Sequence, residues 1–311
     1  MLYQDYGTWL RAELGSRIQK ISIDAGLTCP NRDGRVGWGG CSFCNNRAFS
    51  PEYCREGETV TEQLELGKRF FARKYRDMRY LAYFQAYTGT YGDVERCISL
   101  YEEALSVEGV VGVVIGTRPD CMPDELLDYL ERLNRRTFLV VEYGVESAND
   151  ATLKRINRGH TYADSVEAVN RTAVRGIRVG AHVILGLPGE ERTDLLRQAA
   201  QIGHLPLTTL KLHQLQVIRN TPLERQWRTH PWPMPTVEEY IDLVIDYMTA
   251  FAQSRREALP ALPPCVCERF VSSSPASLRL APQWGLKAHE FSAFLQKRLE
   301  ARTLMKNNLK L

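Results

Sequence analysis

Apolar and polar positions follow two repeating patterns along this chain. Short runs rich in apolar and β-branched residues predict strands, and longer segments with apolar residues at helical spacing predict helices between them. Strands that alternate with helices form parallel β/α units, and nearly continuous apolar runs are typical of strands covered on both faces. The predicted strands are Lys20–Ala25, Tyr80–Tyr87, Val110–Gly116, Phe138–Gly144, Arg178–Gly186 and Thr209–Val217. The predicted helices lie near residues 60–76, 93–107, 123–134, 161–175 and 190–203.

Five of these strands end in polar or glycine-rich residues. In β/α barrels the loops that follow the strands build the active site, so we expect the functional site at this end of the sheet. After Val217 the pattern changes to a proline-marked linker, a helix at about 236–256, a second proline-rich stretch and a basic helical tail. We therefore divide the chain into a core at residues 1–225 and a helical, basic C-terminal extension at residues 226–311.

The composition excludes several classes of protein. The chain of 311 residues is 44% hydrophobic and 25% charged, which rules out collagen-like, fibrous and disordered proteins. No apolar run approaches the ~18 residues of a membrane span, and the first residues do not resemble a signal peptide, so we predict a cytoplasmic protein without membrane contact. The net charge of +3 is uneven, because residues 269–311 carry eight Lys and Arg against two Asp and Glu.

The densest chemical signal is a group of cysteines directly after the first predicted strand. Cys29, Cys41 and Cys44 have the spacing C-x11-C-x2-C, and the glycines between them make the loop pliable enough to fold three sulfurs around one centre. Thiolates select zinc, copper(I) or iron–sulfur clusters. Three interpretations remain open: a [4Fe–4S] cluster with one iron left open, a four-cysteine zinc site that includes Cys54, and unligated core cysteines.

The motif Cys41-Ser-Phe43-Cys44, together with CPNRDG and GGCSFC, resembles the radical S-adenosylmethionine (radical SAM) enzymes. The long gap between the first two cysteines departs from the family's usual C-x3-C-x-aromatic-C and is similar to the YhcC-like branch, a relative of the elongator-type catalytic subunit. The resemblance covers roughly residues 15–290. It implies a partial (β/α)6 TIM-type barrel with a helical C-terminal extension, and a [4Fe–4S] cluster on Cys29, Cys41 and Cys44.

Further motifs fall where this family binds SAM. Members of this family have a Gly-Gly-Glu element that binds the methionine amino group of SAM. Gln85-Ala86-Tyr87-Thr88 occupies the corresponding place here, with different residues. Arg158 corresponds to an arginine that binds the methionine carboxylate in relatives, and a guanidinium binds a carboxylate well. Without the resemblance, Arg158 would be interpreted as a surface cation. His182, alone more often a core residue, matches a ribose contact. The cofactor-binding residues implied by the resemblance are Phe43, Gln85, Tyr87, Thr88, Glu146, Arg158, His182, Gly186 and His213.

The resemblance also implies the reaction and its partners. The expected chemistry is reductive cleavage of SAM to methionine and a 5′-deoxyadenosyl radical, with electrons from a reductant such as flavodoxin or ferredoxin. No residue is assigned as catalytic. Among the other cysteines, Cys97 is expected in the core, and Cys265 and Cys267 are too few for an auxiliary metal. Arg118 and Asp120 are expected to pair.

The substrate is the least constrained part of this interpretation. The helix at 68–79 and the tail from Arg269 onward combine cations with aromatic residues, a composition suited to nucleic acid. Because elongator-type relatives act on wobble uridines of transfer RNA, we hypothesise a transfer RNA substrate; a small-molecule or peptide substrate is the alternative. Two other classes stay open, a non-catalytic zinc RNA-binding module and a hydrolytic metalloenzyme, although the histidines show no HxH or HExxH spacing. The aromatics and tail cations of the RNA hypothesis are Phe70, Phe71, Tyr75, Trp284, Lys297, Arg298, Arg302 and Lys306.

Overall fold

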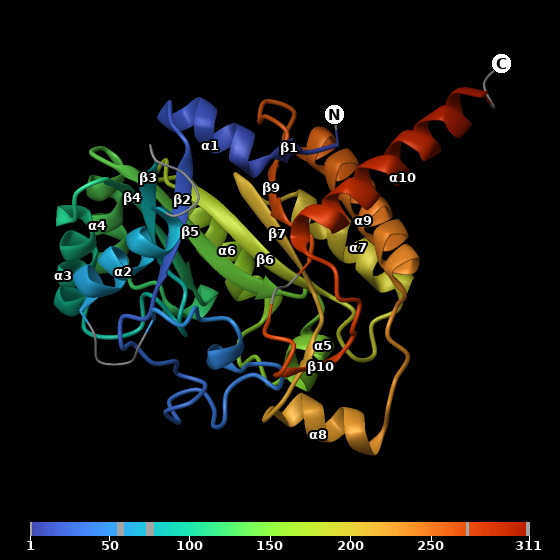
Figure 1. Ribbon diagram of the computed structural model, residues 1–311, viewed down its shortest axis with the longest axis horizontal. Helices are drawn as coiled ribbons and strands as arrows, with labels where there is room; N and C mark the ends of the chain where they lie inside the picture. Colours follow the sequence, from blue (N-terminus) through green and yellow to red (C-terminus); the bar gives the residue numbers. More distant parts are fainter. Residues whose placement is uncertain (1, 55–58, 73–77, 272–273, 309–311) are drawn as a thin grey trace.

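The computed structural model describes residues 2–54, 59–72, 78–271 and 274–308 and contains a curled, parallel eight-stranded sheet (Figure 1). All six predicted strands are confirmed, with ends that differ by a few residues. Two strands of this sheet were not predicted, β1 (Gln4–Asp5) and β9 (Val266–Arg269), because both are too short to produce a clear pattern. The order is β1-β9-β7-β6-β5-β4-β3-β2. The six predicted strands correspond to β2 (Ile18–Ile23), which forms one edge of the sheet, β3 (Arg79–Phe84), β4 (Val110–Thr117), β5 (Phe138–Glu146), β6 (Arg178–Leu185) and β7 (Thr209–Gln214).

The helices connect successive strands and cover the outer face of the sheet (Figure 1). Asp93 is the N-cap of α3 (Val94–Ser106): its side chain accepts a hydrogen bond from the Arg96 backbone N–H. The other predicted helices are α2 (Val60–Ala72), α4 (Asp124–Asn134), α6 (Tyr162–Ala173), α7 (Arg192–Gly203), α9 (Val237–Ala258) and α10 (Ala288–Asn308). The short helices α1 (Tyr6–Leu14), α5 (Asp150–Arg155) and α8 (Pro222–Thr229) were not predicted.

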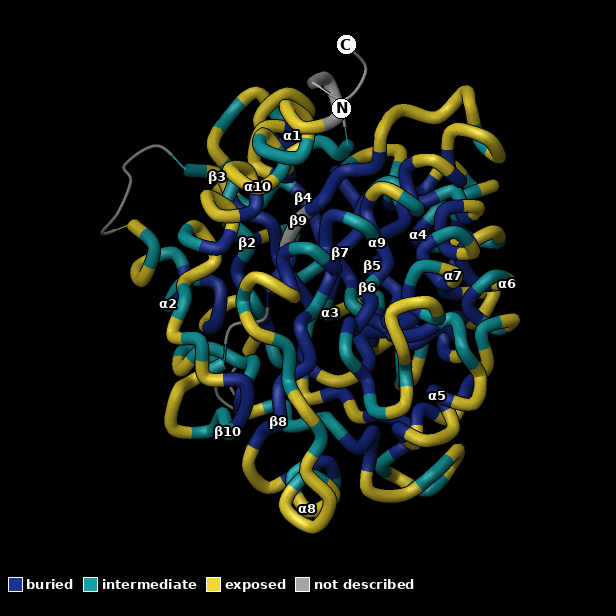
Figure 2. Tube along the Cα trace, turned by 90° about the vertical axis from the view of Figure 1, so that its right-hand side faces the viewer, coloured by how far each residue is buried: buried dark blue, intermediate teal, exposed yellow. Residues whose placement is uncertain are grey.

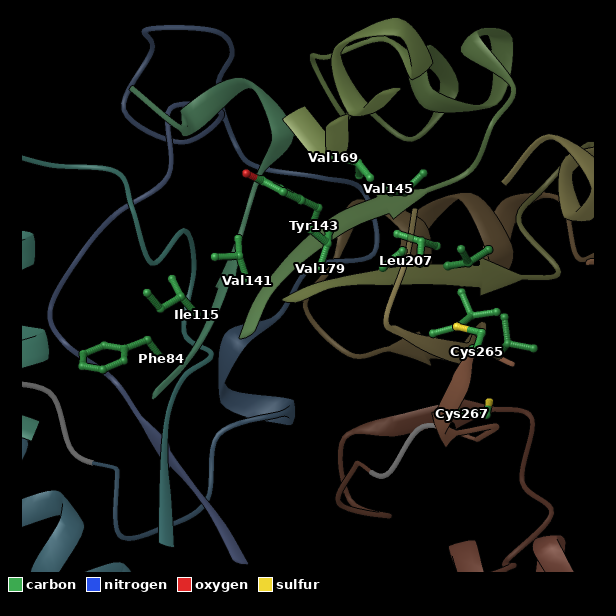
Figure 3. Close-up of a cluster of buried hydrophobic side chains, with 14 of the residues drawn as sticks. Phe84, Ile115, Val141, Tyr143, Val145, Val169, Val179, Leu207, Cys265 and Cys267 are labelled. Carbon is green, nitrogen blue, oxygen red and sulfur yellow. The ribbon is translucent and has the colours of Figure 1, made fainter. Parts of the chain in front are cut away.

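The main hydrophobic core lies between the outer face of the sheet and these helices (Figure 3). Alternate residues of β5, among them Val141 and Tyr143, point into it and are fully buried. Cys265 and Cys267, on either side of the start of β9, are buried in the same core (Figure 3). Cys97 is buried there too, as expected.

The inner face of the sheet differs along its length. At the amino ends of the strands, α1 covers it with a small apolar cluster that includes Trp9, Leu81 and Val140. Further along, polar residues replace apolar ones although the strands remain buried (Figure 2). Alternate residues of the strands therefore point to opposite faces of the sheet, although the strand sequences are almost continuously apolar. In β5, Glu142 and Gly144 lie on the inner face between apolar residues.

The stretch after residue 225 is built closely onto the sheet. Its long helix α9 packs along α7, and β9 pairs with β7. Nearby, β8 (Val217–Ile218) pairs antiparallel with β10 (Arg279–Ala281). No helix in the described parts of the chain is long and apolar enough to cross a membrane.

Candidate functional site

A cavity of about 600 Å³ lies on the inner face, toward the carboxyl ends of the strands. It collects side chains from segments far apart in the sequence, as β/α topology predicts. Of the predicted site residues, Gly186 alone does not line it; this glycine follows β6 with a φ of 94°. The predicted residues that line the cavity are Cys29, Cys41, Cys44, Phe43, Gln85, Tyr87, Thr88, Glu146, Arg158, His182 and His213.

Backbone hydrogen bonds shape the cysteine loop. The Arg32 N–H donates to Cys29 O at 2.8 Å, and the Cys44 N–H donates to Cys41 O at 3.0 Å. The loop is also tied to the segment after α5, because the Ser42 N–H donates to Ile156 O at 2.9 Å and the Asn31 amide donates to the backbone of Asn157. These hydrogen bonds therefore hold in place the loop that carries the three cysteines.

The thiols are electrostatically coupled. Burial raises the pKa of Cys44 to about 11, Cys41 and Cys29 add to the rise, and Arg32 opposes it. Among the described residues, no three His, Cys, Asp or Glu side chains form a group suited to one metal ion. An iron–sulfur cluster bonds each thiolate to a different iron, so its ligands need not meet at one point.

Cys54 does not line the cavity, and its Sγ donates to Ser22 O at 3.0 Å. In the four-cysteine zinc interpretation this thiol would have to exchange that hydrogen bond for the metal.

Arg158 is buried beside Cys41 and is not a surface cation. Its Nη2 donates to Gly144 O at 2.7 Å and lies 3.5 Å from Glu146 Oε1, while Nη1 lies 3.4 Å from Cys41 Sγ. A Cβ added at Gly144 would lie 2.5 Å from both Arg158 Nη2 and Glu146 Oε1. The glycine therefore leaves the space in which these two charged groups meet.

A second layer of residues holds Arg158 in place. Arg158 Nε donates to His160 Nε2 at 3.0 Å, and Arg118 Nη1 donates to Arg158 O at 2.8 Å. Arg118 is itself paired through two nitrogens with Asp120, which confirms the expected pair. Burial, and then the positive charge of Arg158, lowers the pKa of His160 to about 4, so His160 is neutral and can accept the hydrogen bond.

Other features of the cavity fit a polar ligand. Tyr87 and Glu146 have positive φ values of 57° and 64°, a conformation that costs energy in residues other than glycine and is often found at functional sites. The buried Thr88 Oγ1 has no hydrogen-bond partner within the described structure. A ligand with polar groups would satisfy this hydroxyl, so the residues fit SAM.

Sequence reasoning missed a group of charged residues deeper on the inner face. Glu142 accepts from Lys20 at 3.1 Å and from Lys211 at 3.3 Å, and its other contact is with His182 Nε2 at 2.9 Å. Lys211 also donates to Tyr83 Oη at 3.2 Å. One feature of the sequence could have indicated this group: three apolar strands each carry a charged residue near the middle, at a position that points inward.

The surfaces considered for RNA are less available than their composition indicates. In α10, Arg298 pairs with Asp242, and Arg302 pairs with Asp242 and Asp246. Trp284 packs on Tyr240. Phe71 lines the cavity and contacts Phe70, which is 61% exposed. Tyr75 and the side chain of Lys306 lie outside the described residues.

A different exposed aromatic and cationic patch lies on the cysteine loop. Trp38 is 75% exposed, and Arg35 lies over the ring of Tyr91 at 5.9 Å. Arg32 lies 5.4 Å from the ring of Tyr87, which lines the cavity. Arg32, another cation of this loop, therefore lies at the cavity.

Comparisons with known proteins identify the family of this chain. The family model described as Radical SAM superfamily matches residues 29–199, and a Radical_SAM C-terminal domain model matches residues 207–301. The chain is 35% identical to the uncharacterized protein YtqA of Bacillus subtilis over 302 residues, 96% of this chain and 90% of that protein. It is 34% identical to the protein YhcC of Escherichia coli K12 over 280 residues, 90% of this chain and 86% of that protein.

Solved structures share the fold. The archaeal Elp3 of Methanocaldococcus infernus aligns with a TM-score of 0.65 at 17% identity. The alignment covers 92% of this chain and 63% of that one, so the chain spans less than two thirds of that structure's length.

Proposed function

This chain belongs to the radical SAM superfamily, in its YhcC-like branch, and we propose that it binds a [4Fe–4S] cluster on Cys29, Cys41 and Cys44 and cleaves SAM reductively. The observation that carries the proposal is that one cavity is lined by these cysteines, by Arg158 and by Glu146. When bound, the cluster and SAM supply one-electron cleavage of the sulfonium to methionine and a 5′-deoxyadenosyl radical. The protein supplies orientation, electrostatics and shielding from water.

The residues around Cys41 would bind different groups of the amino-acid part of SAM. The Arg158 guanidinium would hold the methionine carboxylate, because a planar guanidinium binds a carboxylate strongly. The carboxylate of Glu146 would accept from the methionine ammonium group. Thr88, whose buried hydroxyl lacks a partner among the described residues, would bind another polar group of SAM.

The two histidines would serve the nucleoside part. His182 and His213 lie on neighbouring strands with ring centroids 5.0 Å apart. His182 Nε2 is occupied by Glu142, which leaves Nδ1 as the nitrogen for a ribose hydroxyl.

The proposal is tested on protein reconstituted with iron and sulfide without oxygen. We expect about four irons per chain and, after reduction with dithionite, slow formation of 5′-deoxyadenosine and methionine from SAM without a substrate. Protein that holds zinc and no iron–sulfur cluster, or that leaves SAM intact after reduction, would overturn the proposal.

For the substrate, we propose a transfer RNA. The proposal is supported by the resemblance to the elongator-type subunit and by the exposed Arg35 and Trp38 of the cysteine loop, where Arg35 lies over the ring of Tyr91. Cations and aromatic rings together bind phosphates and stack on bases. Nucleosides of transfer RNA from cells with and without the gene, compared by mass spectrometry, should differ in a modified uridine. An unchanged profile would favour a small-molecule or peptide substrate.

A further inference from the structure

Two of the three cysteine sulfurs at the cavity are approached by side-chain N–H groups from their own loop. Asn31 Nδ2 lies 3.7 Å from Cys41 Sγ, and Arg32 Nη2 lies 3.9 Å from Cys44 Sγ. The same Arg32 nitrogen lies 3.4 Å from the backbone oxygen of Cys44, which keeps the guanidinium beside this cysteine. The segment that begins with Cys29 therefore supplies one sulfur and, directly after it, donors to the other two.

Asn31 is a buried amide whose N–H groups are both directed to defined acceptors. The residue is 1% exposed, and Nδ2 donates to Asn157 O as well as to Cys41 Sγ. A Cβ added at Gly37 would lie 2.3 Å from Asn31 Oδ1, so this glycine leaves the space that the amide occupies. Asn31 Oδ1 itself has no hydrogen-bond partner within the described structure, and a buried acceptor without a partner costs free energy. The N–H groups are thus the part of this amide that the structure uses.

Arg32 adds a positive charge to the same surroundings. It is half-buried and lines the cavity, so solvent screens its charge less than that of an exposed arginine. When an iron–sulfur cluster is reduced, it gains one negative charge, and hydrogen bonds to its sulfurs and nearby net charge set its reduction potential. A donor or a cation at a cysteine sulfur therefore favours the reduced form. Arg158 also reaches Cys41 Sγ, but its guanidinium is already assigned to the carboxylate of SAM.

We propose that Asn31 and Arg32 are positioning residues that act through Cys41 and Cys44 to raise the reduction potential of the cluster. This inference rests on the proposed function for the presence of the cluster. The step that the two residues favour is the transfer of one electron from a reductant such as flavodoxin or ferredoxin, and no bond to either residue forms or breaks. Asn31 would act through its dipole and Arg32 through its charge.

The test is a redox titration of the reconstituted protein without SAM, with dithionite as reductant and the electron paramagnetic resonance signal of the reduced cluster as readout. Arg32→Gln should lower the equilibrium constant for reduction by about two- to tenfold, the range that corresponds to one hydrogen bond. A tenfold change lowers the midpoint potential by about 59 mV for one electron. Arg32→Lys keeps the charge and should restore part of the shift. Arg47→Gln, which changes an exposed arginine shortly after Cys44, is the matched control and should leave the potential unchanged.

Asn31 needs a control that separates the contact with sulfur from the anchoring of the loop. Asn31→Ala removes both and should lower the midpoint potential. Asn157→Gly removes the anchoring bonds from the Asn157 amide to Trp38 O and Gly40 O but leaves the amide on Cys41 Sγ. Glycine also accepts the positive φ of 53° at this position, so Asn157→Gly should keep the potential of the unchanged protein.

The potentials are compared among proteins that hold about four irons per chain. Unchanged potentials in Arg32→Gln and Asn31→Ala would overturn the inference, and so would equal shifts in Arg47→Gln or Asn157→Gly. If one of the two variants does not bind the cluster, the other decides, and loss of iron from both would assign Asn31 and Arg32 to the structure of the loop and overturn the inference. Absence of a cluster from the unchanged protein, measured separately as iron content, would instead overturn the proposed function and the inference with it.

Discussion

The two faces of the sheet in this protein are made by alternate residues of the same strands, but the two faces have different roles. In β5 the outward residues Leu139, Val141 and Tyr143 are all fully buried in the main core. The inward residues Glu142 and Gly144 line the cavity. The outer face stabilises the fold through apolar burial, while the inner face gives up such stabilisation for charge and space. Substitutions on the two faces should therefore separate stability from chemistry.

The largest effect is expected at the cysteines that border the inner face. Replacing Cys29, Cys41 or Cys44 with Ala should abolish bound iron and the brown absorbance, since each change removes one of the three ligands that we propose for the cluster. Cys54→Ala is the matched control and should keep about four irons per chain. Equal loss of metal in Cys54→Ala would contradict the three-cysteine assignment.

A large effect of another kind is expected on the outer face. Leu139→Ala should lower the free energy of unfolding by about 2–5 kcal/mol, the usual range for a truncated core leucine, because Leu139 is fully buried. Urea unfolding of the metal-free protein measures the change. Thr88→Val is the comparison on the inner side, and it should change stability little because it removes a hydroxyl without a described partner. A similar loss in both variants would show that the inner residues also carry the fold.

The next effect separates ligand binding from cluster binding. Arg158→Ala should weaken SAM binding by about 1.5–3 kcal/mol, the range for a hydrogen bond to a charged group, while iron content stays unchanged. Equilibrium dialysis with labelled SAM gives the affinity. Unchanged affinity would mean that Arg158 has only a structural role, through its contacts with Glu146 and Gly144 O.

The difference between the two faces also explains what the sequence could and could not predict. The outward residues of the strands and the helices that they contact produce a clear periodic pattern in the sequence, so the six strands β2 to β7 were predicted. The cysteines and Arg158 were found through motifs. Lys20, Glu142 and Lys211 were missed because each is a single charge in an apolar run, and their meeting depends on the register of non-adjacent strands. Likewise β9, which pairs with β7, follows a proline-rich stretch and is too short for a periodic signal.

A smaller effect should depend on pH. His160 is neutral in the folded chain because burial and Arg158 lower its pKa to about 4, whereas in the unfolded chain it takes up a proton below about 6.5. The unfolded state then binds more protons, so the free energy of unfolding should fall as the pH falls from about 6.5 to 4 and should not change from this cause above that window. His160→Gln should reduce the fall, as measured by urea unfolding at a series of pH values. An identical pH dependence in both proteins would contradict the assignment.

The smallest expected effect concerns the outer surfaces that could bind transfer RNA. Each phosphate contact contributes about 0.9 to the slope of log K against log salt for a duplex, and about 0.7 for a single strand. Arg35→Gln, beside the exposed Trp38, should therefore reduce the slope by nearly one unit. Arg298→Gln should change the slope less, because Arg298 already pairs with Asp242. Its helix α10 also lies at the opposite end of the sheet from α5 and α8 (Figure 1). A larger change in Arg298→Gln than in Arg35→Gln would move the RNA-binding surface to α10, and a flat salt profile in the unchanged protein would argue against transfer RNA as the substrate.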